Sequence, residues 1–379
     1  MRTLTGILRK GAVALAASAV AAMTASSAFA TPGIFYRSNP LVSDQPGVAP
    51  VTDPLLVNAW GIAFLPPIPE VLPNGGPFWI NDNGKGVSTL YDGLGAIIEV
   101  AMGVQFVVTI PPPTGGEPPS APTGMVSNLT AGFCGDVFVF DTEDGTLSGW
   151  QLSDNLDAVL RIDNSDQDAI YKGLELASTR AGVPTLYATD FHNGKIDTFQ
   201  TASDDTCGYE QVTLAGNFKD PKLPKGYAPF NIKLIKGKLY VTYALQDEDA
   251  EDDVPGRGHG FINIFDTDGH FIRRFASGGN LNSPWGMSIA PKRFGNVAGK
   301  LLVGNFGDGR INVFDPNFGL ISAPLYTRNG FHISPLVIDG LWALIDGTGA
   351  LNAQPNSLYF TAGPDGETHG LFGTITPGF

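Results

Sequence analysis

The stretch Leu301–Asp315, LLVGNFGDGRINVFD, predicts a β-hairpin. It begins with an apolar run, passes through a turn rich in glycine and aspartate, and ends in a second apolar run. Gly307 and Gly309 can adopt the positive φ that a tight connection between two strands requires. An isolated hairpin is marginal in water. The stretch therefore decides the fold only because the chain repeats it, in variants, about every 50 to 60 residues.

Each of the six copies begins with a first strand that precedes the hairpin, so the chain is read as a repeat protein. The second strand is apolar at consecutive positions, as in Leu186–Ala188, which suits a strand buried on both faces. The third strand alternates between apolar and polar residues, as in Ile262–Ile264. We take as the matching position of the six first strands Gly61, Gly124, Gly173, Phe230, Gly286 and Gly340.

The composition favours an all-β protein, because 48 glycines and 29 prolines supply many turns between short apolar runs. Radial closure of the copies leaves only short exposed edges, so we predict a six-bladed β-propeller. The sixth copy lacks a fourth strand, whereas residues 35–43 precede the first copy. We predict that this N-terminal segment pairs into the last blade as its outer strand and closes the ring.

The first thirty residues are typical of a signal peptide. Arg2, Arg9 and Lys10 form a basic start, an apolar run follows, and Ala28–Ala30 fits a cleavage site. We therefore expect a signal peptide over residues 1–30 and a single propeller domain over residues 31–379. The expected product is soluble, monomeric, without a membrane anchor, and located in the periplasm or outside the cell.

The formal net charge of −14 disfavours nucleic acid and anionic membranes as partners. Such a surface suits cations or neutral ligands, although acidity can also serve solubility alone. The two cysteines, Cys134 and Cys207, map to connections on the same face of adjacent blades. We expect them to form a disulfide in an oxidising compartment.

Several motifs resemble a known family. The first strand with its glycine, followed by Leu-Tyr-x-x-Asp and Gly-x-Ile-x-x-Phe-Asp, is similar to NHL-type six-bladed propellers. TDFHNGKIDTF, GYAPFNI, LVGNFGDGRINVFDP and FTAGPDGETHGLFG resemble an exported bacterial propeller family without an assigned activity. The resemblance implies a propeller released from the cell, since some members carry a membrane helix near the C-terminus that this sequence does not show. It implies no catalytic residues.

Candidate ligands of a metal lie in the connections on one face of the propeller. We call this the top face: it carries the turns between second and third strands and the approaches to the first strands. Converging carboxylate and amide oxygens could hold Ca²⁺. The alternative is that these side chains bond their own backbone in turns. The candidate metal ligands are Asp82, Asn231, Asn305 and Asp339.

Further candidates for ligand binding line the expected top mouth of the central channel. Trp60, Phe230 and Trp285 occupy matching positions and could stack on a sugar or another flat ligand, or pack between blades. Histidines in top connections could act as bases, but no paired spacing or nucleophile motif accompanies them. The remaining tentative members of this set are Asn58, Asp190, His192 and His369.

The acidic run Asp247–Asp253 lies in a long top connection of the fourth copy. It lacks the spacing of a calcium loop, so we expect a solvated loop that could act as a lid or collect cations.

Two functions remain open on this evidence. The first is a non-catalytic binding or interaction protein for a small molecule, a glycan or a protein. The second is a calcium-assisted hydrolase, lactonase or lyase that acts at the top mouth. A fold of this class hosts both, so it does not decide between them.

Overall fold

The computed structural model describes residues 34–203, 208–319 and 321–378. The predicted signal peptide at residues 1–30 and Cys207 lie outside the described residues. Residues 34–379 form one compact unit. Within the described part, no helix is long and apolar enough to cross a membrane.

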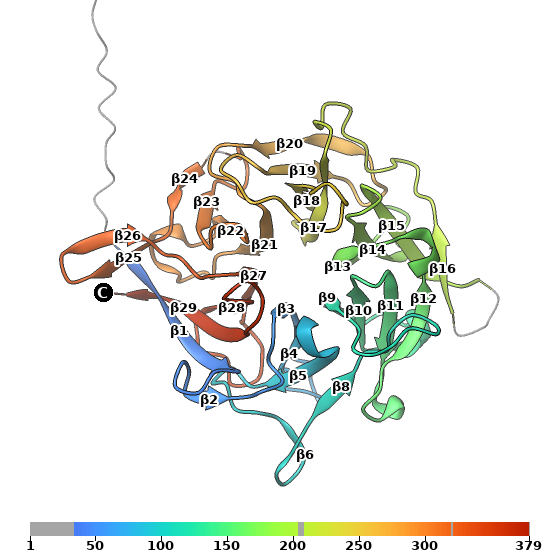
Figure 1. Cartoon of the computed structure of the whole chain (residues 1–379), viewed down its shortest axis with the longest axis horizontal. Helices are drawn as coiled ribbons and strands as arrows, with labels where there is room; N and C mark the ends of the chain where they lie inside the picture. The colour runs from blue at the N-terminus through green and yellow to red at the C-terminus, as the bar shows by residue number, and fades with distance from the viewer. Residues whose placement is uncertain (1–33, 204–207, 320, 379) are drawn as a thin grey trace, which may run out of the picture. The chain divides into compact units, whose positions relative to one another are not determined.

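The described residues form a ring of six antiparallel blades, which confirms the predicted six-bladed β-propeller (Figure 1). The first three blades, each given from the innermost strand outward, are β3 (Ala59–Ala63), β4 (Phe78–Asp82), β5 (Val87–Tyr91) and β8 (Val107–Thr109); β9 (Pro122–Ser127), β10 (Phe138–Thr142), β11 (Thr146–Trp150) and β12 (Val159–Asp163); and β13 (Tyr171–Ser178), β14 (Pro184–Asp190), β15 (Lys195–Thr201) and β16 (Tyr209–Val212).

The other three blades follow the same order. They are β17 (Tyr227–Ile235), β18 (Lys238–Leu245), β19 (Phe261–Phe265) and β20 (Phe271–Ser277); β21 (Pro284–Ile289), β22 (Leu301–Asn305), β23 (Ile311–Phe314) and β24 (Ile321–Pro324); and β27 (Leu341–Asp346), β28 (Leu358–Ala362), β29 (Leu371–Gly378) and β1 (Phe35–Ser43), with β2 (Val51–Thr52) at its edge.

Short elements decorate the connections between these strands. Two small hairpins project from the ring: β6 (Glu99–Ala101) with β7 (Val104–Gln105), and β25 (Tyr326–Asn329) with β26 (His332–Pro335). Single turns of 3₁₀-helix in the described part are η1 (Asn83–Lys85), η2 (Phe133–Gly135), η3 (Leu152–Asp154), η4 (Ser165–Gln167) and η5 (Gly295–Val297).

Strand β1 closes the ring, as predicted. It pairs antiparallel with β29, in a register that runs from Phe35 opposite Gly378 to Ser43 opposite Leu371. The edge that the C-terminal strand would otherwise expose is thus covered by residues from the other end of the described chain.

Every innermost strand carries a one-residue bulge at the same place. In blade 5, Pro284 pairs with Asn305 and Met287 pairs with Val303, so one residue between them is extra. The bulge brings neighbouring innermost strands very close: a Cβ on Gly286 would lie 2.4 Å from the carbonyl oxygen of Trp342. Glycine is therefore required there by contact with the next blade rather than by a turn.

The position of the bulge shows that two of the six sequence copies were misaligned. Register places Asn231 of blade 4 and Ala343 of blade 6 at the position that glycine holds in the other four blades. The choice of Phe230 and Gly340 for this position was therefore wrong. Asn231 replaces the close contact with a hydrogen bond, since its Nδ2 donates to the carbonyl oxygen of Trp285 at 2.8 Å.

Candidate functional site

One side chain from each innermost strand lies immediately before the bulge position, and together they form a ring near the top of the channel. All six are buried, with at most 5% of any aromatic member exposed. We call them the top ring: Trp60, Thr123, Lys172, Phe230, Trp285 and Trp342.

Aromatic members of the top ring meet across the axis of the propeller. Trp60 of blade 1 lies 6.4 Å from Trp285 of blade 5, and Phe230 of blade 4 lies 5.9 Å from Trp342 of blade 6. Neither pair comes from neighbouring blades. Phe306 stacks on Trp342 with ring centres 3.9 Å apart. Because side chains from non-adjacent blades touch, the top ring fills the channel at this level.

Lys172 is the cationic member of the top ring and has a 2% exposed side chain. Its ammonium lies 5.5 Å from the ring centre of Trp60, a cation–π geometry. It also forms ion pairs with Glu143 and, at 3.2 Å, with Asp252. Burial alone lowers the pKa of Lys172, but the two carboxylates outweigh burial and raise that pKa above its usual value. The lysine therefore stays charged.

Carboxyl groups from three top connections gather around this lysine. Glu143 lies between β10 and β11, Asp252 and Asp253 lie between β18 and β19, and Glu367 lies between β28 and β29. Burial, followed by repulsion from Glu143, raises the pKa of Glu367 to about 7. Burial also raises the pKa of Asp253 to about 6. Two carboxyl groups here therefore titrate near neutral pH.

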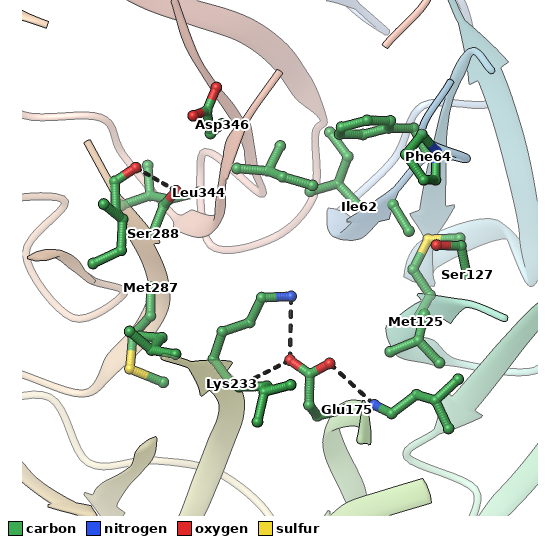
Figure 2. A pocket seen from close by; sticks show the side chains of 18 of the residues that line it. Ile62, Phe64, Met125, Ser127, Glu175, Lys233, Met287, Ser288, Leu344 and Asp346 are labelled. Atoms are coloured by element: carbon green, nitrogen blue, oxygen red, sulfur yellow. Dashed lines mark hydrogen bonds and ion pairs between the residues drawn. The ribbon is translucent and has the colours of Figure 1, made fainter. Parts of the chain in front are cut away.

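The opposite, bottom end of the channel is open. The C-terminal halves of all six innermost strands line a cavity of about 430 Å³ there (Figure 2). Its walls are apolar in their deeper part, and a narrow continuation of about 40 Å³ leads upward to Trp285. The apolar wall residues are Ile62, Met125, Leu174, Ile232, Met287, Leu344 and Ile345.

An ion pair crosses one side of this bottom cavity. The ammonium of Lys233 lies 3.4 Å from Oε2 of Glu175, which also accepts the backbone N–H of Leu234 at 2.9 Å. The other carboxylate oxygen, Oε1, accepts the N–H of Leu176 at 3.0 Å. Figure 2 shows the Lys233 side chain directed into the cavity, with Ser127, Ser288 and Asp346 around the mouth. A cavity of this size and lining is typical of a small-molecule site.

Two proteins of Acanthamoeba polyphaga mimivirus are similar to this chain over most of their lengths. Uncharacterized protein R648 is 33% identical over 352 residues, which cover 90% of this chain and 80% of the viral protein. Uncharacterized protein L690 is 34% identical over 354 residues, covering 90% and 85%. The chain belongs to the family of these mimivirus proteins. No family model matches the sequence.

The fold of this chain is also found among solved structures. A solved structure of a Bacteroides thetaiotaomicron protein of unknown function is similar to this chain with a TM-score of 0.51 and 10% sequence identity, over 90% of this chain and 76% of the other. At that identity the likeness shows the fold alone.

The sequence predicted aromatic residues and Asn58 at the top mouth, and the structure brings these side chains together. Trp60, Phe230 and Trp285 meet inside the top ring, and Asn58 lies beside it. The Oδ1 of Asn58 accepts the indole N–H of Trp342 at 2.9 Å. Its Nδ2 donates to Asn83 at 3.1 Å. Asn58 thus anchors the ring from blade 1.

The candidate metal ligands lie in different blades: Asp82 and Asn305 end β4 and β22, Asp339 precedes β27, and Asn231 lies within β17 rather than in a top connection. Buried Asp82 accepts the hydroxyl of Thr89 at 2.7 Å, and burial raises the pKa of its carboxyl well above the usual value. Asn305 is fully buried and donates to the carbonyl of Asn280 at 2.8 Å. Exposed Asp339 accepts the N–H of Asp365. Among the residues that the structure describes, no cluster of three or more His, Cys, Asp and Glu side chains is arranged to hold a metal.

Of the remaining candidates, Asp190 is the last residue of β14, and His192 and His369 lie in top connections. Asp190 accepts the N–H of Asn193 at 3.1 Å and lies 3.4 Å from the Lys195 ammonium. His369 pairs through Nδ1 with Asp44 at 2.7 Å, which ties the segment after β1 to the turn before β29. The carbonyl of His192 accepts the amide of Gln246 at 3.2 Å. Cys134 lies in η2, and its predicted disulfide with Cys207 stays a prediction.

Sequence reasoning missed Trp342, Lys172 and the bottom cavity. A signal for the first two was present, since each stands directly before the position that glycine occupies in most copies. Trp342 escaped notice because Gly340 was aligned in place of Ala343. The pairing of Glu175 with Lys233 joins different blades and left no local signal in the sequence.

Proposed function

We propose that this protein is a non-catalytic binding protein that takes a small ligand into the bottom mouth of its channel. The observation that carries the proposal is the cavity of about 430 Å³ at the ends of the innermost strands. Its size lies in the range of small-molecule sites, and its lining combines apolar walls with a few polar groups. The packed top ring supports placing the ligand at the bottom end of the channel, because the ring's side chains fill the channel near its top end.

The proposal extends to where the protein works. The basic, apolar N-terminal thirty residues support export, and the formal charge of −14 supports a soluble product. The motifs GYAPFNI and LVGNFGDGRINVFDP support kinship with exported NHL-like propellers of bacteria. Measuring the mass of the secreted protein tests the export proposal, because cleavage after Ala30 fixes a new N-terminus at Thr31.

A fluorescent amphipathic probe tests the proposed site. Anilinonaphthalene sulfonate should bind the protein saturably, with about one molecule per chain. Ser127→Trp places an indole at the mouth of the cavity and should abolish that binding. Ser153→Trp is the control, because Ser153 is exposed in η3 and does not line the cavity. Absence of saturable binding, or equal binding by the Ser127 variant, would contradict the proposal.

A second candidate function is the metal-assisted hydrolase, lactonase or lyase at the top. The observation that favours it is the pair of carboxyl groups, Glu367 and Asp253, with pKa values raised to about 7 and about 6. Groups that titrate near neutral pH are suited to proton transfer. The calcium of this version would need ligands among Asp82, Asn231, Asn305 and Asp339, which lie in different blades.

Two measurements separate this candidate from the binding protein. Elemental analysis of protein purified without chelator shows whether calcium is bound, and melting curves with and without EDTA show whether it stabilises the protein. No bound metal and no change in Tm would rule out the calcium-assisted version. A screen of lactones and esters tests catalysis. Activity that survives Glu367→Gln and Asp82→Ala unchanged would place the reaction elsewhere.

A further inference from the structure

Two lysines line the bottom cavity, Lys233 and Lys236, and the side chain of Lys233 reaches into it. An ammonium has three N–H donors. Among the described residues, the Lys233 ammonium has one ion-pair contact, with the Glu175 carboxylate. The distance of 3.4 Å is long for a hydrogen bond between charged groups. The lysine side chain is 41% exposed, and it reaches into the cavity (Figure 2). Donors of Lys233 thus remain for a guest.

Glu175, by contrast, is committed to the protein. Its side chain is 10% exposed, and both carboxylate oxygens accept backbone N–H groups from two neighbouring strands. On the far side of the mouth, Oδ1 of Asp346 accepts both the N–H and the hydroxyl of Thr348. Three of these four carboxylate oxygens thus accept hydrogen bonds from the chain, whereas Lys233 faces the cavity.

The deeper cavity fits an apolar body. Met125 and Met287 are 5% and 2% exposed, and they stand among branched aliphatic side chains of the other blades. Methionine adapts to guests of different shape because its side chain is unbranched and polarisable. Burial of apolar ligand surface here favours binding, against the cost of association.

We propose that the bottom cavity binds a small organic monocarboxylate, with its carboxylate on Lys233 and its apolar body among Met125, Met287 and Leu344. This inference rests on the proposed function, because it names the ligand class of the same cavity. A carboxylate is the group that a lysine with free donors recognises best, and such charged hydrogen bonds are stronger than neutral ones.

Three probes of equal chain length test the head group. Decanoate, decanol and decylamine are titrated by calorimetry at pH 8, below their micelle concentrations, into the full-length mature chain. Decanoate should bind at least about tenfold more tightly than decanol, which corresponds to about 1.4 kcal/mol. Decylamine should bind more weakly than either of the other two probes, because its ammonium would be repelled by the ammonium of Lys233.

Variants of Lys233 test whether this lysine binds the carboxylate. Lys233→Met should remove the advantage of decanoate over decanol, whereas Lys233→Arg should keep it. Lys238→Met is the matched control: this lysine is exposed on the neighbouring strand and does not line the cavity. Each variant is first checked for an unchanged Tm. An advantage for decanoate that persists in Lys233→Met would overturn the inference.

The outcomes also separate this inference from the proposed function. Equal binding of decanoate and decanol, both blocked by Ser127→Trp, would leave a ligand-binding cavity but overturn the carboxylate. Preference for decylamine would do the same and would point to Asp346. No saturable binding of any probe would overturn both proposals. If Ser127→Trp unfolds, Leu234→Trp, at an exposed position of the lining, takes its place.

Discussion

Trp60 and Trp342 stack with ring centres 3.6 Å apart and an angle of 14° between their planes. They belong to the first and last blades, so the stack crosses the junction at which the propeller closes. Thr361 reinforces it, since its hydroxyl donates to the carbonyl oxygen of Trp60. The junction is thus held at the axis by these aromatic rings and at the rim by the pairing of β1 with β29.

Trp342→Ala should destabilise the protein by about 3–5 kcal/mol, the usual cost of removing a large buried aromatic side chain. The loss combines the stack with Trp60, the stack with Phe306 and the hydrogen bond to Asn58. Urea unfolding monitored by circular dichroism measures it. Phe331→Ala is the control, because this phenylalanine is fully exposed. A similar, small effect of both changes would contradict the packed top ring.

Gly286→Ala should cost about 1–3 kcal/mol, because the new methyl group meets the backbone carbonyl of Trp342 at 2.4 Å. The matched change in the next blade is Ala343→Gly, which removes a methyl group from the equivalent position. It should cost only about 0.5–1 kcal/mol. Thermal unfolding of the two variants compares them directly. If Ala343→Gly were the more harmful change, the close contact would not be what requires glycine.

Glu367 should make stability depend on pH. Its folded-state pKa of about 7 exceeds the usual value of 4.5, so the folded protein binds the proton more tightly than the unfolded chain. The stability that it contributes is present at low pH and is lost as the pH rises from about 4.5 to about 7. The effect is at most about 1.4 kcal/mol per pKa unit, and less for a group in contact with water.

Glu367→Gln should therefore flatten the fall in stability across that pH range. Urea midpoints of the wild type and the variant, measured from pH 4.5 to pH 8, give the difference curve. Asp365→Asn is the control, since Asp365 is exposed in the same turn. A difference curve without slope would mean that Glu367 titrates as an ordinary surface carboxyl.

Lys172→Met should destabilise the protein by about 1–3 kcal/mol at pH 8, below the full cost of breaking a buried pair because Glu143 and Asp252 are partly solvated. Lys172 opposes the rise in the pKa of Glu367. Its removal should therefore move the titration of Glu367 to higher pH. NMR of labelled glutamate carboxyl groups measures the shift, and an unchanged titration would contradict the electrostatic coupling.

Glu175→Gln should cost about 1–3 kcal/mol, although the two side chains have nearly the same shape. The amide NH₂ of glutamine would face a backbone N–H that now donates to a carboxylate oxygen, so one buried donor would lose its acceptor. Lys233→Met should cost less, because Lys233 is partly exposed. Denaturant unfolding ranks the two, and the reverse order would contradict the role assigned to Glu175.

The repeat pattern was sufficient to predict the blades and the closing strand, because periodic apolar runs and turn residues are local signals. It predicted three members of the top ring, Trp60, Phe230 and Trp285, but not Lys172 and Trp342. The bulge shifts each innermost strand by one residue, and the pairing register of the strands shows where that shift falls. The association of Lys172 with Asp252 likewise depends on a long connection whose path no local pattern fixes.

The pairing of β1 with β29 sets an order of events during synthesis. Residues 35–43 leave the ribosome before any blade is complete, yet their partner strand at residues 371–378 emerges only after the strands of the first five blades. At about 5–20 residues per second, the first segment waits on the order of tens of seconds with its backbone unpaired. Five blades can form in that interval, but the ring cannot be finished before β29 has been made. Of all the described segments, β1 is thus the one that has to be kept from other chains for the longest time.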